Sequence, residues 1–72
     1  MTKEEIKQLR KKLGLKQEHF GKILGYANPI VRVCEIETGT VPISLRTQLL
    51  CKQIKWLSTN HPEIIAAIVE SL

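Results

Sequence analysis

The sequence contains no aspartate and little that would line a catalytic cleft. All seven acidic residues are glutamates, and only three of the 72 residues are aromatic: Phe20, Tyr26 and Trp56. A catalytic site normally needs paired acid–base groups or a nucleophile beside a base. The sequence offers no such pairing, so we expect neither an enzyme nor a bound cofactor.

Cysteine is also scarce, and long apolar runs are absent. Cys34 and Cys51 lie 17 residues apart with no CxxC motif, and together with His19 and His61 they show no ligand spacing, so no disulfide framework or metal site is expected. The longest apolar run, 64–69, has six residues, whereas a membrane-spanning helix needs about 20. Residues 1–5 lead into no apolar stretch, which argues against a signal peptide. We therefore expect a cytoplasmic protein with no membrane partner.

The length and charge of the chain narrow the class further. A chain of 72 residues predicts one domain, residues 1–72, and buries only about 60% of its unfolded surface. Eleven Lys and Arg residues against seven Glu give a net charge of +4. An excess of positive charge is compatible with a polyanionic partner such as nucleic acid.

The apolar residues recur with a helical period almost everywhere, which predicts an all-α fold. Thr2 and Glu5 form a capping-box pattern, Asn28 precedes Pro29 at a favoured helix start, and Ser44 is a good N-cap. The five expected helices are 3–13, 17–24, 28–38, 45–58 and a last one that begins at residue 62.

The two central helices form a recognisable unit over about residues 17–38. A short helix ends at Gly25, a brief turn follows, and a second helix begins at Asn28 and runs to Glu37-Thr-Gly. Two short helices joined in this way predict helix-turn-helix geometry.

The same region resembles the Xre-type, lambda-repressor-like helix-turn-helix family. The matching residues are the run Leu9–Gly25, then Glu37–Gly39 and Pro42, and the resemblance covers residues 3 to about 57. It implies a five-helix lambda-repressor-like domain that binds DNA. Two positions depart from the family: Lys16 stands where a polar cap is usual, and Gly21 where alanine is usual.

The turn before the third helix leaves two registers open. If the Glu-x-Gly end of that helix is aligned with the family, the turn is about two residues longer than usual, and Val33 and Ile36 are buried. An ungapped turn would bury Val31 and Cys34 instead. We prefer the longer turn, and Arg32 points away from the core in both registers.

The second helix of such a unit enters the major groove of DNA, where side chains near its N-terminus reach the base edges. An arginine there can bond two atoms of guanine, and an apolar side chain can contact a thymine methyl. The expected base-reading residues are Asn28, Val31, Arg32 and Glu35. The expected contacts to the DNA backbone are Lys16, Gln17, Lys22, Thr38, Thr40 and Arg46. The simpler alternatives are that Arg32 and Glu35 form only a solvated pair and that Val31 is buried.

One such unit contacts few base pairs, so a twofold-symmetric dimer is expected. The apolar residues of segment 45–72 predict its interface. They are Leu50, Ile54, Trp56, Leu57, Ile64, Ile65, Ile68, Val69 and Leu72. The alternative is that the last helix folds back onto the first helix of its own chain and completes the core.

We therefore predict a homodimeric DNA-binding transcriptional repressor that acts on a palindromic operator, and the resemblance implies autoregulation in a bacterium or phage. The alternative, which the same family also implies, is an antitoxin-like module that neutralises a toxin-like partner protein. A third and weaker hypothesis is a nonspecific architectural DNA binder.

Overall fold

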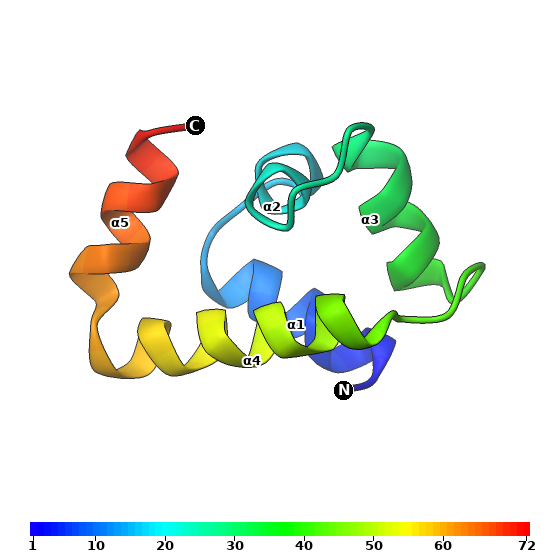
Figure 1. Ribbon diagram of the computed structural model, residues 1–72, viewed down its shortest axis with the longest axis horizontal. Coiled ribbons are helices and arrows are strands. Elements are labelled where there is room, and N and C mark those ends of the chain that lie inside the picture. Colours follow the sequence, from blue (N-terminus) through cyan, green and yellow to red (C-terminus); the bar gives the residue numbers. More distant parts are fainter.

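The chain folds into five α-helices and contains no β-strand. The computed structural model describes all 72 residues. The helices are α1 (Lys3–Lys12), α2 (Gln17–Ile23), α3 (Pro29–Thr38), α4 (Leu45–Asn60) and α5 (Pro62–Glu70) (Figure 1). The all-α prediction is confirmed, and each helix boundary that the sequence predicted lies within two residues of the observed one.

The longest helix, α4, runs along one edge of the molecule. In Figure 1 α2, α3 and α5 all lie on the same side of α4, and α5 rises steeply from its C-terminal end. The most extensive packing is between α2 and α3; α1 packs against α3 and α4, and α5 against α4 and α2.

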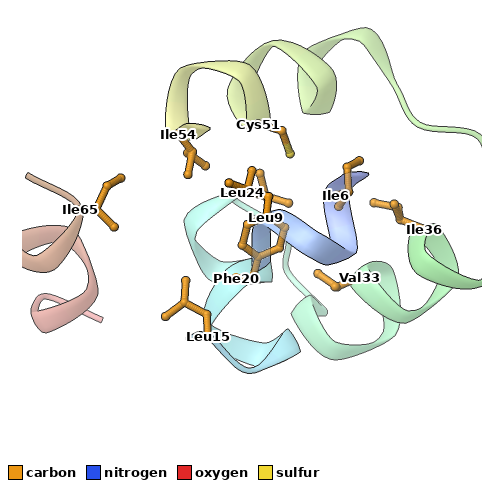
Figure 2. Packing of buried hydrophobic residues seen from close by; sticks show 10 residues of the cluster. All are labelled: Ile6, Leu9, Leu15, Phe20, Leu24, Val33, Ile36, Cys51, Ile54 and Ile65. Atoms are coloured by element: carbon orange, nitrogen blue, oxygen red, sulfur yellow. The ribbon is translucent and has the colours of Figure 1, made fainter. Parts of the chain in front are cut away.

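Ten buried hydrophobic residues form one cluster to which all five helices contribute (Figure 2). Phe20 and Ile6 are completely buried. The full set is Ile6, Leu9, Leu15, Phe20, Leu24, Val33, Ile36, Cys51, Ile54 and Ile65. Because α5 contributes Ile65 and the partly buried Val69 packs against the cluster, the last helix belongs in part to the core of the single chain.

This packing corrects two residues of the expected dimer interface. Ile54 and Ile65 are buried among core residues of their own chain, so they have almost no surface left for a second copy. The sequence period places them on apolar sides of their helices, but it does not distinguish an apolar side that faces the chain's own core from one that faces a partner.

The helix starts follow the predicted caps with one exception. Thr2 and Glu5 form the reciprocal capping box, and the amide of Thr47 donates to the Ser44 hydroxyl at 3.2 Å. Asn28 occupies the N-cap position of α3, but its side chain makes no capping hydrogen bond. Its backbone (φ −115°, ψ 76°) departs from the extended conformation usual at an N-cap. The prediction that Asn28 caps through its side chain is therefore wrong, and that amide is free for other contacts.

Candidate nucleic-acid interface

The corner between α2 and α3 depends on a close approach of two residues. Gly25 has φ +83°, a left-handed conformation that glycine adopts without strain, and it ends α2. Within α2, a Cβ built on Gly21 would lie 2.6 Å from the Cα of Pro29. Only glycine leaves room for the first turn of α3 at this point, which accounts for a glycine where the resembled family has alanine.

The rotation of α3 about its own axis decides which side chains it exposes. Val33 and Ile36 are buried against the core, whereas Val31, Arg32 and Cys34 are exposed. The structure therefore has the register of the longer turn. It also removes the alternative that Val31 is a core residue.

A buried ion pair joins the C-terminal part of α3 to α1. The Arg10 guanidinium donates from Nε to one Glu37 oxygen at 2.7 Å and from Nη2 to the other at 3.0 Å. Its Nη1 donates to the carbonyl of Leu15 at 3.0 Å. The side chain of Gln17, at the start of α2, also donates to Glu37 at 3.3 Å. This network holds α1, α2 and α3 in a fixed arrangement.

No pattern in the sequence predicts the Arg10–Glu37 pair, because the two residues lie 27 positions apart on helices that meet only in the fold. The side chain of Gln17, expected at the DNA backbone, lies instead within this network. A second such link joins the turn before α3 to α4: the hydroxyls of Tyr26 and Thr47 share a hydrogen bond. It too leaves no local signal in the sequence.

The exposed side of α3 carries the four residues expected to read bases. Asn28 and Arg32, one helical turn apart, line a shallow groove of about 470 Å³ between the turn and the loop before α4. Val31 and Glu35 lie on the side of α3 opposite the buried Val33. The Arg32 guanidinium lies 3.5 Å from the Glu35 carboxylate. The structure thus brings all four onto one exposed side.

The exposed side of α3 also includes a residue that the sequence analysis did not single out. Ile30 is about half exposed and adjoins the exposed Val31 at the N-terminal tip of α3. Together with Glu18 of α2, these two residues line a second small hollow. The sequence contains no clear signal for this exposure, because Ile30 lies three residues before the buried Val33, a spacing that places two residues on neighbouring parts of one helix face.

The six residues expected at the DNA backbone fall into two groups. Lys16 and Arg46 are exposed and have no ion-pair partner. Lys22 lies 3.4 Å from the carboxylate of Glu18, and the hydroxyls of Thr38 and Thr40 share a hydrogen bond of 2.8 Å. Gln17 donates to Glu37, as described above. The two unpaired cations therefore have the most freedom to meet a phosphate.

The remaining predicted interface residues differ in exposure. Trp56, Ile64 and Leu72 are exposed, and Leu50, Leu57, Ile68 and Val69 are half-buried. No helix combines the length and hydrophobicity that crossing a membrane requires, and no three side chains of His, Cys, Asp or Glu come together as metal ligands would. Comparison with protein-family models, curated proteins and solved structures finds no match to this chain.

Proposed function

We propose that the chain is a sequence-specific DNA-binding protein that represses transcription, with α2 and α3 as a helix-turn-helix and α3 as the helix that reads the major groove. The observation that carries the proposal is the exposed side of α3, where Asn28, Val31, Arg32 and Glu35 lie on a helix locked against its neighbours. A rigid helix with free polar side chains near its N-terminus is what direct readout of bases requires.

The Arg32–Glu35 pair is compatible with this role. Both side chains are partly exposed, and an exposed pair three residues apart on a helix contributes only about 0.2–0.5 kcal/mol. A guanine that accepts two hydrogen bonds from an arginine contributes about 1–3 kcal/mol. The arginine would therefore exchange its carboxylate contact for the base at little cost.

The test is to substitute Arg32 on an operator selected from random duplexes. Arg32→Ala should weaken operator binding about 5- to 150-fold, the equivalent of 1–3 kcal/mol, and relax the preference at one base pair per half-site. Arg32→Lys is the matched control, because it keeps the charge and loses the bidentate geometry. It should lose the same base preference while retaining affinity for random DNA.

Backbone contacts should behave differently. Lys16→Ala and Arg46→Ala should weaken binding to all sequences about equally and reduce the dependence of affinity on salt. If Arg32→Ala lowers operator and random-duplex affinity by the same factor, Arg32 does not read a base. If selection yields no preferred sequence at all, the third hypothesis, a nonspecific binder, replaces the proposal.

We further propose that the repressor is a homodimer formed through α5. Ile64 is exposed there, the half-buried Ile68 lies one turn further along the same side of the helix, and the exposed Leu72 follows just beyond the helix end. Ile64→Glu tests this interface, because Ile64 lies outside the buried core and its substitution should leave the monomer folded. We expect light scattering to show monomers with unchanged circular dichroism, and operator affinity to fall steeply. A variant that remains dimeric would place the interface elsewhere.

A further inference from the structure

Helix α4 has a second apolar side that the rest of the chain leaves largely exposed. Its inner side is buried through residues such as Cys51 and Ile54, and Figure 2 shows both pointing from α4 toward the core. Leu45, Leu49 and Trp56 lie on the other side, with 71%, 49% and 57% of their surfaces exposed. They are three of the seven large hydrophobic residues that the chain exposes.

These three side chains form one straight stripe. At 100° per residue, spacings of four and seven residues place Leu45, Leu49 and Trp56 within about 40° of one another around the helix and roughly opposite Cys51. These are the spacings of the residues through which paired helices contact each other. The stripe runs over twelve residues, and the eleven steps between its ends cover about 16 Å at the rise of an α-helix. It is therefore long enough to accept about three turns of another helix.

The charges that α4 itself carries are all of one sign. α4 carries Arg46, Lys52 and Lys55 and no acidic residue. Lys52 lies along the stripe itself, between Leu49 and Trp56. Lysine stems cover apolar surface while their ammonium groups remain in water at its edge. A partner helix on the stripe would thus meet an apolar centre bordered by cations.

We propose that this outer face of α4, defined by Leu45, Leu49, Lys52 and Trp56, docks an amphipathic helix of a different protein, one with apolar residues on its contact side and glutamate or aspartate beside them. A second copy fits poorly. Pairing two α4 helices about a twofold axis would bring Lys52 close to its symmetry mate and would join two helices that each carry three cations and no acidic residue. Like charges in register across an interface oppose association, whereas an acidic helix would pair with Lys52 within the stripe.

This proposal goes beyond DNA binding and does not depend on it. The base-reading residues lie on α3, and the proposed dimer contact lies on α5, so a helix bound along Leu49, Lys52 and Trp56 would leave both available. Arg46, at the N-terminal edge of this face, keeps its proposed place at the DNA backbone. A repressor with such a face could bring a second protein to its operator or be controlled by one.

The experiment uses the full chain and two synthetic 21-residue helical peptides without tryptophan, one of leucine and glutamate and the other with lysine in place of every glutamate. Trp56 is the only tryptophan of the protein, so its emission reports directly on the stripe. The acidic peptide should give a saturable blue shift, and the lysine peptide should not. Leu49→Ala, at an exposed position, should weaken acidic-peptide binding at least tenfold without changing the circular dichroism spectrum.

Reversing the charge of Lys52 tests the proposed preference for an acidic partner. Lys52→Glu should weaken binding of the acidic peptide at least tenfold and allow the lysine peptide to bind, whereas Lys7→Glu, the same charge change on the exposed surface of α1, should alter neither. The proposal is overturned if both peptides bind wild-type protein with equal affinity or if neither gives a saturable shift. It is equally overturned if Trp56 emission shifts with protein concentration alone and Leu49→Ala abolishes that shift, because the face would then be covered by a second copy.

Discussion

The Arg10–Glu37 pair should make a large contribution to stability, and it can be removed from either side. Both side chains are nearly inaccessible, at 13% and 4% exposure, and two hydrogen bonds of 2.7 and 3.0 Å join them. Arg10→Met leaves the Glu37 carboxylate buried with only the amide of Gln17 as a donor, and it also deprives the Leu15 carbonyl of its arginine donor.

The expected loss follows from this burial. Removing one partner of a buried ion pair costs about 3–5 kcal/mol, because the remaining charge stays out of water without compensation. A 72-residue domain has a total stability of about 4–11 kcal/mol, at about 0.05–0.15 kcal/mol per residue. Either Arg10→Met or Glu37→Met should therefore lower the free energy of unfolding by a large part of its total. The double variant should recover most of the loss, since it leaves no unpaired charge.

Urea unfolding of the wild type, both single variants and the double variant measures the coupling directly. Lys22→Met is the internal control: it breaks the exposed Glu18–Lys22 pair, at 3.4 Å, and should change stability by less than about 0.5 kcal/mol. If Arg10→Met costs no more than Lys22→Met, the network does not hold the three helices together. Losses that simply add in the double variant would show that the two residues act independently.

Three further predictions concern packing and titration. Gly21→Ala should destabilise the fold despite the higher helix propensity of alanine, because overpacking costs about 1–3 kcal/mol and the added methyl meets backbone; a higher melting temperature would contradict the close α2–α3 contact. Burial raises the pKa of the Cys51 thiol to about 11, so a thiol reagent at pH 8 should label the exposed Cys34 rapidly and Cys51 only on unfolding; equal rates would refute its burial. The Thr2 amide donates to the Glu5 carboxylate and lowers the pKa of Glu5. The stabilisation from this hydrogen bond is complete above the pKa that Glu5 has in the unfolded chain, and it is lost as the pH falls through the lower pKa of Glu5 in the folded protein. Glu5→Gln should therefore reduce the loss of stability that the wild type shows on acidification.

The elements of the fold were predictable because their signals are local. A capping box, a proline at N1 and a serine N-cap each act within one helical turn, and the apolar period shows which side of a helix faces inward. The sequence also predicted which residues of α3 face the core, because the helix start at Pro29 and the stop at Gly39 fix its ends. Gly39 has φ +79°, the left-handed conformation that ends helices.

The contacts that lock the candidate site were not predictable, because they join residues far apart in the chain. Nothing near Arg10 in the sequence indicates that it meets Glu37, and nothing near Gly21 indicates that Pro29 presses against it. Asn28 illustrates the opposite difficulty. An asparagine at the N-cap position usually caps the helix through its side chain. In the turn before α3 the backbone of Asn28 is not in the usual N-cap conformation, so this hydrogen bond does not form and the side-chain amide stays exposed on the proposed reading side.

In helix α4 the apolar pattern of the sequence predicts two contact surfaces but not which residues belong to each. Its apolar residues cover about half of the helix circumference, more than one core contact requires, so the sequence already indicates a second contact surface. It does not divide the residues between the two. The structure assigns Cys51 and Ile54 to the core and leaves Leu45, Leu49 and Trp56 in solvent. On α4, the broad interface expected over residues 45–72 therefore separates into a core-facing side and an outer face. Because every charge that α4 carries is positive, the outer face is better matched to an acidic partner than to itself.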